Sequence, residues 1–364
     1  MTKMIKISII GAGPAGNYLA YLLAKNNFDV SVFEEHETAG MPVQCTGITT
    51  SYLGKLVELK EDFVVNKVNK ARIFAPDNHF IDIKLDDNII LDRARFDQYL
   101  MEKAKKAGAK LFLSHRFLGY KGNIIKVQNI KANMIKDIET DYLVGADGPL
   151  SDVAKSAGLK YKKDFLIGIQ ARVRLNNSNI VEFYPFIERY AWVVPESKDI
   201  VRIGLATRKN PKKALNDFLR KRLKKYEIID MQAGLIPVYN PKIKTQKENI
   251  FLVGDAAAMV KATTGGGIIQ GMMAARALAG SIINKKDYNK EWKKAIGRDL
   301  LIHLKIGSIM NKFSAKDWNY LIELFNKEKT KKILSSYDRD FPSKFLVKLA
   351  LTEPRLLYFL KYVF

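Results

Sequence analysis

The stretch KISIIGAGPAG, residues 6–16, decides the fold expected for this chain. Its first five residues are a short apolar run typical of a buried parallel strand, and a glycine turn follows. Gly11 permits the tight turn after the strand, Gly13 lets a phosphate approach the backbone, and Gly16 lets the next helix pack closely on the strand. The pattern predicts a strand–turn–helix unit whose helix N-terminus, near Ala15, points its amides at a pyrophosphate.

The residues after this unit complete the sequence pattern of a dinucleotide-binding site. Helical periodicity from Pro14 to Lys25 is followed by a second apolar strand at Asp29–Phe33. Glu34 ends that strand, close to the spacing at which a carboxylate accepts the ribose hydroxyls of an adenosine. A glycine turn without a ligand is the alternative, but the strand, the helix and the acid in this order favour a dinucleotide site.

Composition and charge narrow the class of protein. The chain has 364 residues, enough for two domains, and Cys45 is its single cysteine, so no intrachain disulfide or cysteine-based metal site can form. The N-terminus carries no cleavable signal and no uncharged apolar run reaches about 18 residues, so we expect a cytoplasmic protein without a membrane span. The formal net charge of +23 favours anionic partners, with a lysine-rich composition bias as the alternative, and the lack of a nucleic-acid-binding motif argues against nucleic acid.

Two further motifs resemble parts of a known flavin site. The apolar run Ile250–Val253 leads into Gly254-Asp255-Ala256-Ala257, which resembles the second FAD fingerprint of the flavin hydroxylase and reductase superfamily. The run Val144-Gly145-Ala146-Asp147-Gly148 resembles the third fingerprint of that superfamily. The resemblance implies that FAD is the cofactor, that Asp255 contacts its ribityl chain, and that the fold is the α/β fold of para-hydroxybenzoate hydroxylase.

Four shorter segments resemble the geranylgeranyl reductases within that superfamily. They are the cysteine loop 42–48 (PVQCTGI), the segment 91–97 (LDRARFD), the aromatic motif 190–195 (YAWVVP) and the glycine loop 264–268 (TGGGI). Val194 stands where the family has phenylalanine. The resemblance implies a flavin-dependent oxidoreductase acting on CH–CH bonds, which saturates the geranylgeranyl chains of archaeal ether-lipid precursors.

The resemblance also assigns site residues. Those expected to act at the substrate face are Cys45, Tyr190 and Trp192. Those expected to bind FAD are Gly11, Gly13, Ala15, Gly16, Glu34, Cys45, Thr46, Gly47, Arg93, Asp255, Gly266, Gly267 and Ile268. Further candidates for the wall of an apolar tunnel are Phe183, Tyr184 and Phe186, with core packing as the alternative for each. For Cys45 the alternative is a small buried hydrophobe.

The expected partners follow from the same reasoning. No second glycine fingerprint is present, so we expect an external reductant, NAD(P)H or an acidic carrier such as ferredoxin, to dock transiently. The substrate is expected to be an isoprenoid lipid, with the protein peripheral to the anionic cytoplasmic face of the membrane. Two other hypotheses are an FAD-dependent monooxygenase of a small aromatic substrate and a non-catalytic prenyl-binding protein.

The C-terminal segment 341–364 has two interpretations. Its apolar residues alternate with four lysine and arginine residues, the pattern of a helix that lies on a membrane surface. Pro354 divides the segment into two short amphipathic pieces. The alternative is a helix pair that packs on the FAD-binding domain and closes the tunnel.

The order of these signals along the chain predicts an α/β protein with interleaved domains. A Rossmann-like FAD-binding domain carries an inserted antiparallel β-sheet substrate domain and a helical C-terminal region. The FAD-binding domain is expected at 1–70, 92–160 and 246–283, the substrate domain at 71–91 and 161–245, and the helical region at 284–364.

Overall fold

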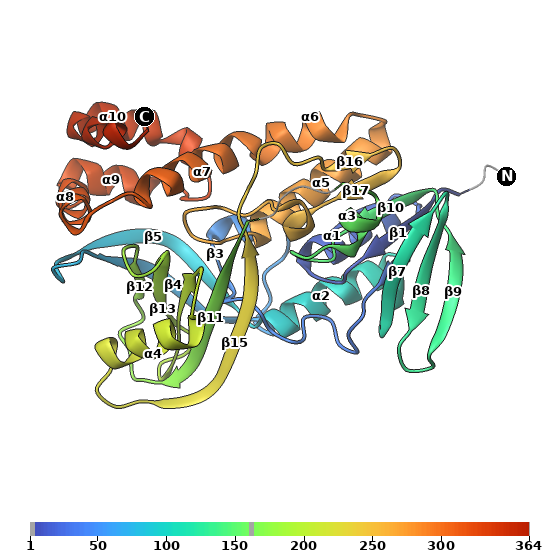
Figure 1. Ribbon diagram of the computed structural model, residues 1–364, viewed down its shortest axis with the longest axis horizontal. Coiled ribbons are helices and arrows are strands. Elements are labelled where there is room, and N and C mark those ends of the chain that lie inside the picture. Colours follow the sequence, from blue (N-terminus) through green and yellow to red (C-terminus); the bar gives the residue numbers. More distant parts are fainter. Residues whose placement is uncertain (1–3, 160–163, 364) are drawn as a thin grey trace.

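The computed structural model describes residues 4–159 and 164–363, and Figure 1 shows two regions built on sheets with a row of helices above them. The first region contains a six-stranded sheet. In spatial order its strands are β16 (Gln246–Lys247), β17 (Ile250–Leu252), β10 (Tyr142–Gly145), β1 (Lys6–Ile10), β2 (Asp29–Phe33) and β6 (Lys110–Phe112). All neighbouring pairs are parallel except β16–β17, so the glycine turn lies where the carboxyl ends of central strands meet.

Three long helices pack beside this sheet. The first, α1 (Pro14–Ala24), contacts both α2 (Arg93–Lys106) and α5 (Ile268–Asn284). Asp92 caps α2, because its side chain accepts a hydrogen bond from the backbone amide of Arg95 at 3.0 Å. This cap sets the first turn of the helix, which carries Arg93.

The second region is an eight-stranded sheet. In spatial order its strands are β15 (Glu227–Pro237), β11 (Phe165–Arg174), β14 (Ile200–Thr207), β13 (Tyr190–Pro195), β12 (Val181–Tyr184), β4 (Val64–Phe74), β5 (Phe80–Leu91) and β3 (Ile48–Thr49). The sheet is antiparallel except for the parallel pair β12–β4. One face is covered by α4 (Pro211–Arg222), whose Leu215 and Leu219 are fully buried in the core of this region.

The residues after α5 form the helical region along the top of Figure 1, with α6 right of the middle and α8, α9 and α10 at the left. Its helices are α6 (Tyr288–Trp292), α7 (Arg298–Met310), α8 (Ala315–Phe325), α9 (Glu328–Ser336) and α10 (Leu346–Thr352), followed by a 3₁₀ segment (Pro354–Tyr362). Both α8 and α9 contact β5, so this region lies against the eight-stranded sheet. No helix in the described part of the chain has the length and apolarity needed to cross a bilayer.

The structure confirms the fold class and corrects several expected elements. In the eight-stranded sheet, β4 starts at Val64, before the expected position 71. The sheet also includes β3, which lies within the segment 1–70 that was expected to belong to the FAD-binding domain. A three-stranded sheet of β7 (His115–Lys121), β8 (Ile124–Asn129) and β9 (Met134–Glu139), with α3 (Asp152–Ser156) against β7, was not expected. The expected boundary at 160/161 lies outside the described residues, and the domain boundaries remain a prediction.

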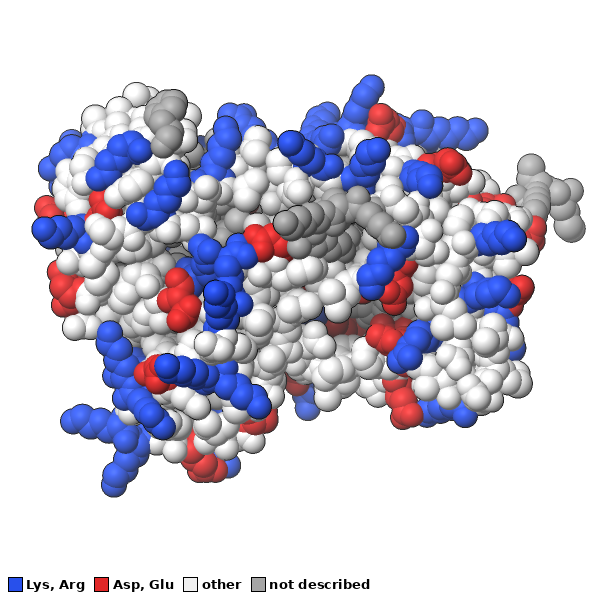
Figure 2. Space-filling model, in the orientation of Figure 1, with Lys and Arg blue, Asp and Glu red and all other residues white. Residues whose placement is uncertain are grey.

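Charge is spread over the surface rather than gathered in one patch. Figure 2 shows Lys and Arg over every part of the visible face, with Asp and Glu between them. Many lysines pair with a neighbouring acid, as in the Lys126–Asp137 contact at 2.9 Å. The excess positive charge is therefore a general field around the protein, and exposed pairs of this kind contribute little to stability.

Candidate active site

One cavity of about 1190 Å³ joins the two regions and the C-terminal helices. Its lining starts at the glycine turn and Glu34, passes the cysteine loop and the glycine loop 264–268, and continues over the inner face of the eight-stranded sheet. The volume exceeds the range of about 300–1,000 Å³ of most small-molecule pockets. It can hold a dinucleotide together with a second, elongated ligand.

The glycine turn is shaped by close backbone contacts on one side and open space on the other. A Cβ atom at Gly11 would overlap the backbone of Ala146, and one at Gly16 would overlap the carbonyl oxygen of Gly11. A Cβ atom at Gly13 would meet no atom within 4 Å, and Gly13 lines the cavity. The turn therefore leaves bare backbone beside the N-terminus of α1, where a pyrophosphate fits.

Glu34 stands at the opening of this turn. Its Oε2 accepts a hydrogen bond from the backbone amide of Ala12 at 2.8 Å, and its Oε1 accepts from the amide of His36 at 3.0 Å. Oε1 also contacts Nδ1 of His36 at 2.6 Å, whereas Oε2 keeps a second lone pair, so Glu34 can still accept a ribose hydroxyl through Oε2. The carboxylate is held in place before any ligand binds.

Asp147, from the third fingerprint, carries an orphaned polar atom at the same end of the cavity. Its Oδ2 accepts from the backbone amide of Val153 at 3.0 Å, whereas its buried Oδ1 has no hydrogen-bond partner among the described residues. Burial raises the pKa of Asp147 above its usual value. A hydroxyl of the cofactor would satisfy Oδ1, so this residue, like the bare glycine backbone, fits FAD.

Arg93 connects the FAD-binding domain to the cysteine loop. Its guanidinium forms an ion pair with Asp97 at 3.0 Å, and the Cys45 thiol also lies within its hydrogen-bonding reach. Burial opposes the charge on Arg93, but the Asp97 carboxylate outweighs it and holds the pKa of Arg93 above its usual value. Cys45 is half-buried, and its Sγ accepts from the amide of Gly47 at 3.4 Å. The thiol thus has a fixed position at the cavity wall.

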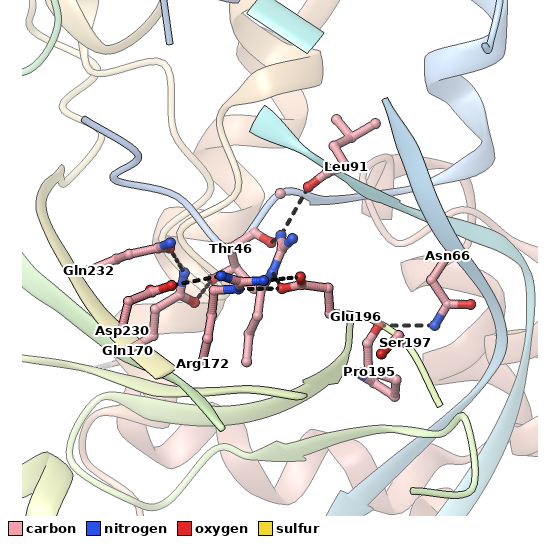
Figure 3. A network of polar contacts seen from close by, with 12 residues as sticks. Thr46, Asn66, Leu91, Gln170, Arg172, Pro195, Glu196, Ser197, Asp230 and Gln232 are labelled. Atoms are coloured by element: carbon pink, nitrogen blue, oxygen red, sulfur yellow. Dashed lines mark hydrogen bonds and ion pairs between the residues drawn. The ribbon is translucent and has the colours of Figure 1, made fainter. Parts of the chain in front are cut away.

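A polar network beneath the sheet face fixes the cysteine loop (Figure 3). Nη1 of Arg202 donates to the carbonyl oxygens of Thr46 at 2.5 Å and of Leu91 at 2.9 Å. Its Nε donates to Glu196 at 2.8 Å, and Arg172 also donates to that carboxylate. Only 8% of the Arg202 side chain is exposed. The ion pair of Arg202 and Glu196 therefore replaces the hydrogen bonds to water that both groups lose on burial.

Gln170 extends this network toward the substrate side. The Thr46 hydroxyl donates to Oε1 of Gln170 at 2.8 Å, and Nε2 of Gln170 donates to Gln232 at 2.7 Å, as Figure 3 shows. The indole N–H of Trp192 donates to the same Oε1 at 3.3 Å. The aromatic motif and the cysteine loop are therefore linked through one amide side chain.

Tyr190 faces the glycine loop 264–268. Its hydroxyl is buried and has no partner in the described part of the chain, and a Cβ atom at Gly265 would collide with it. Burial raises the pKa of Tyr190, so the hydroxyl stays protonated. Gly266, Gly267 and Ile268 line the cavity at the N-terminus of α5, together with Asp255.

The inner face of the sheet follows the strand alternation. Phe183 lines the cavity, whereas its neighbour Tyr184 points to the opposite face and stacks on Phe74 with ring centroids 4.5 Å apart. Phe186 packs in the cores outside the cavity. Phe183 therefore lies at the cavity wall, where it stays a candidate for the tunnel, whereas Tyr184 and Phe186 follow the core-packing alternative.

The structure thus gathers the predicted residues around one cavity. All of the residues assigned from the resemblance line it except Gly16, whose position in the turn is a packing position. Sequence reasoning missed two groups of residues. The first is the buried network of Gln170, Glu196 and Arg202. The second, from β5 and the C-terminal region, lines the far end of the cavity: Asn88, Phe325, Leu334, Tyr337, Arg339 and Phe345.

A weak signal for the first group is present in the sequence. Gln170 and Arg202 are polar residues inside runs that are otherwise strongly apolar, LIGIQARV and IVRIGLAT. A buried polar residue in such a strand must have a partner. Which partner it has could not be read from the sequence.

Comparisons with known proteins agree with this site. The model of the FAD binding domain family matches residues 4–179. Digeranylgeranylglycerophospholipid reductase of Methanocaldococcus jannaschii is 29% identical, with 99% of this chain and 98% of the relative covered. The reductase of the same name from Methanothrix thermoacetophila is 28% identical, with 90% of this chain and 93% of the relative covered.

Solved structures show the same fold. A geranylgeranyl bacteriochlorophyll reductase-like protein from Thermoplasma acidophilum has a TM-score of 0.85 at 24% identity, covering 99% of this chain and 100% of that one. The flavin-dependent halogenase CmlS has a TM-score of 0.71 at 15% identity, covering 96% of this chain and 77% of that one. Residues 4–179 thus match the FAD binding domain family, and over at least 90% of its length the chain is similar to digeranylgeranylglycerophospholipid reductases.

Proposed function

We propose that this protein is an FAD-dependent reductase that saturates the double bonds of geranylgeranyl chains in archaeal ether-lipid precursors. The observation that carries the proposal is the single cavity that runs from the FAD-binding turn to an apolar chamber between the sheet and the C-terminal helices. The names of the curated relatives support the same reaction.

The reaction needs a source of electrons, a proton and exclusion of water. FAD, once reduced, would supply a hydride, which carries both electrons and one of the two hydrogens that saturation adds, and which side chains cannot provide. The protein must orient the prenyl chain in a dry cavity and hold a proton near the second carbon. Phe183 and Trp192 supply flat apolar surfaces for the chain, and Tyr190 holds a proton on its unpartnered hydroxyl.

Cys45 is proposed as a substrate-face residue rather than a nucleophile. Its neighbours are Arg93 and the Gly47 amide, and neither is a base that could deprotonate the thiol. The side chain is small and weakly polar, so it can border the prenyl chain without introducing water.

The decisive experiment measures lipids. Expression of this chain together with an unsaturated archaeal lipid pathway should yield lipids whose masses rise by two hydrogens per saturated bond, in mass spectra of total extracts. A yellow protein that leaves every mass unchanged, while oxygen uptake is coupled to NADPH oxidation, would overturn the reductase in favour of a monooxygenase. A colourless protein would instead support a prenyl-binding protein.

The reductant is proposed to be external. Among the described residues the glycine turn of the FAD site has no second copy for a nicotinamide cofactor, and the net charge of +23 favours an acidic carrier such as ferredoxin. Rapid-mixing reduction of the bound flavin by ferredoxin and by NAD(P)H compares the two. A ferredoxin rate that falls steeply with salt supports docking by charge, and fast reduction by NADPH alone excludes it.

Peripheral membrane binding is proposed for the C-terminal segment. Leu349 and Phe359 are buried, but Val347, Leu351 and Leu357 are 67%, 76% and 54% exposed. The segment therefore packs with one side and offers an apolar surface with the other, next to basic side chains. The helices of the segment pack against α7, α8 and α9, and its contact with a membrane stays a prediction.

Point substitutions test this surface better than truncation, because the Tyr362 hydroxyl donates to Asp317 at 2.6 Å and the segment helps to hold α8. The variant Leu351→Ser/Leu357→Ser should lose sedimentation with vesicles of phosphatidylcholine and phosphatidylglycerol. The control Leu118→Ser removes a leucine that is 45% exposed on β7. Equal sedimentation of both variants and the parent would exclude the segment as the membrane contact.

A further inference from the structure

Two hydrogen-bond donors lie in the part of the cavity wall that the FAD site does not use. Asn88 comes from β5 and Arg339 from the segment after α9, and both line the cavity. Nη1 of Arg339 donates to Oδ1 of Asn88 at 2.8 Å. Since a guanidinium can only donate, the amide of Asn88 must present its oxygen to Arg339 and turn its Nδ2 elsewhere.

The Asn88 amide group is left with an unmet hydrogen-bonding requirement. Asn88 is only 2% exposed, and its buried Nδ2 has no acceptor among the described residues. Buried polar atoms without a partner are rare in folded proteins, and those that line a cavity are normally satisfied by a ligand or water. The N–H groups of Nδ2 therefore require an oxygen acceptor on a ligand or a water molecule.

Among the described residues Arg339 forms no ion pair within 4.0 Å, although its charge and that of Asp340 attract each other over a longer distance. The other Lys and Arg residues that line the cavity form ion pairs: Arg93 with Asp97, Arg116 with Glu35 and Lys155 with Asp152. For Arg339 no carboxylate lies within ion-pair distance in residues 4–159 and 164–363.

The two neighbouring acids are already engaged. Asp338 and Asp340 do not line the cavity. Asp338 accepts from the hydroxyl of Thr50 at 2.7 Å, and Asp340 is paired with Lys261. An acceptor that reaches Arg339 and Asn88 from the cavity therefore meets two donors, and one of them is charged.

The surroundings of this donor pair are apolar. Ile83 and Leu85 from β5, Leu334 from α9 and Phe345 line the same part of the cavity. Asn88 lines the cavity together with Ile83 and Leu85, and the β4–β5 ladder is irregular beside it, between Val68 and Lys70. A ligand that satisfies the site combines a long apolar chain with an anionic oxygen group.

We propose that Asn88 and Arg339 form a subsite for the phosphate group of the isoprenoid lipid substrate. The proposal rests on the proposed function and assigns two residues of this chain to the phosphate end of that substrate. The planar guanidinium donates to two phosphate oxygens at once, and Nδ2 of Asn88 donates to a third position on the same group. The apolar chain then extends from this anchor over the sheet face toward Cys45.

The test measures binding rather than turnover, so that it is independent of the reductase reaction. The full-length protein with oxidised FAD is titrated with geranylgeranyl monophosphate and with geranylgeraniol, and no reductant is added. The parent should bind the phosphate ester about ten- to a hundredfold more tightly than the alcohol, as expected for a lost charged hydrogen bond. Arg339→Gln should remove most of this preference and leave the affinity for the alcohol unchanged.

Two further variants show whether the geometry matters. Arg339→Lys keeps the charge without the planar fork, so it should retain part of the preference. Arg116→Gln removes a cavity-lining cation that is paired with Glu35, and it should keep the parent's preference.

Three results would overturn the subsite. The first is an unchanged preference in Arg339→Gln, and the second is a parent protein that binds neither lipid. The third is a shift in the flavin absorption spectrum and reduction potential of Arg339→Gln with no change in lipid preference, since the pair would then serve a flavin oxygen. Selective binding of the phosphate ester by a protein that reduces no lipid would instead uphold the subsite and refute the proposed reaction.

Discussion

The two ends of the cavity are built in different ways. At the cofactor end the decisive contacts join residues close in sequence: Glu34 accepts from the amide of Ala12, and Gly16 packs on Gly11. At the lipid end, where the isoprenoid substrate is proposed to bind, Asn88 contacts Arg339 and Thr50 contacts Asp338. These pairs are 251 and 288 positions apart in the sequence. A local motif is enough to predict the glycine turn and Glu34, although the turn also packs on Ala146, whereas no local motif predicts the contacts of the second end.

The largest expected effect is at the lipid end. Lys261 and Asp340 form an ion pair whose side chains are only 7% and 2% exposed, which ties the segment after α9 to the base of the glycine loop 264–268. Lys261→Met leaves the buried Asp340 carboxylate without its ion-pair partner, so the free energy of unfolding should fall by about 3–5 kcal/mol. Chemical denaturation followed by circular dichroism measures the loss.

The double variant Lys261→Met/Asp340→Leu should recover much of that stability, because it leaves no unpaired charge. The matched control Lys126→Met breaks the exposed pair with Asp137 and should cost less than about 1 kcal/mol. If Lys261→Met lowers the free energy of unfolding no more than this control does, the buried Lys261–Asp340 pair does not stabilise the lipid end more than an exposed pair would.

The next effect is a pH dependence at the same end. Burial lowers the pKa of His303 to about 4, with the charge of Lys261 adding to the effect, and the Thr263 hydroxyl contacts its Nδ1 at 2.8 Å. The unfolded chain takes up this proton near pH 6.5, so the stability contributed by neutral His303 is complete above pH 6.5 and is lost as pH falls toward 4. The shift corresponds to about 3 kcal/mol.

Denaturation curves of the parent and of His303→Gln between pH 7 and pH 4 check this contribution. Between pH 7 and pH 4 the free energy of unfolding of His303→Gln should fall much less than that of the parent. Parallel curves for the two proteins would mean that His303 accepts a proton in the folded state as easily as in the unfolded chain.

A smaller effect is expected at the cofactor end. Glu34→Ala removes an acceptor for ribose hydroxyls, and charged hydrogen bonds of this kind contribute about 1.5–3 kcal/mol each. FAD affinity, measured by flavin fluorescence after deflavination, should therefore fall, while lipid binding at the other end is kept. Glu34→Gln keeps one acceptor oxygen and should lie between the parent and Glu34→Ala, and an unchanged affinity in both variants would refute the adenosine assignment.

The smallest effect on stability is expected between the two ends. Cys45→Ser exchanges one small side chain for another at a half-buried position, so the free energy of unfolding should change by less than about 1 kcal/mol and FAD should stay bound. Lipid saturation should nevertheless decrease, because the side chain borders the substrate. Full activity in Cys45→Ser would make Cys45 a packing residue.

The same contrast explains how far the sequence could predict the site. The glycine turn, Glu34 and Asp255 follow a motif with fixed spacing, and the structure brings them to one cavity. For Tyr184 the tunnel and core-packing alternatives stayed open, because aromatic character does not reveal which side of a strand a residue faces.

Asn88 and Arg339 were missed for a different reason. The β4–β5 ladder is irregular beside Asn88, and no local pattern pairs it with a residue 251 positions away. The same limit hid the partners of Arg202, which joins the cysteine loop to the end of β5.

The strand order of the cofactor sheet also has a consequence for how the chain matures. β17 lies beside β10, which in turn flanks β1, so the sheet that carries the first glycine turn waits for residues near 252 to leave the ribosome. The lipid end waits longer, because Tyr337, Arg339 and Phe345 are synthesised after β17. During translation the six-stranded sheet that carries the FAD site can fold first. The apolar chamber then stays exposed to chaperones and to the membrane surface until the C-terminal helices fold over it.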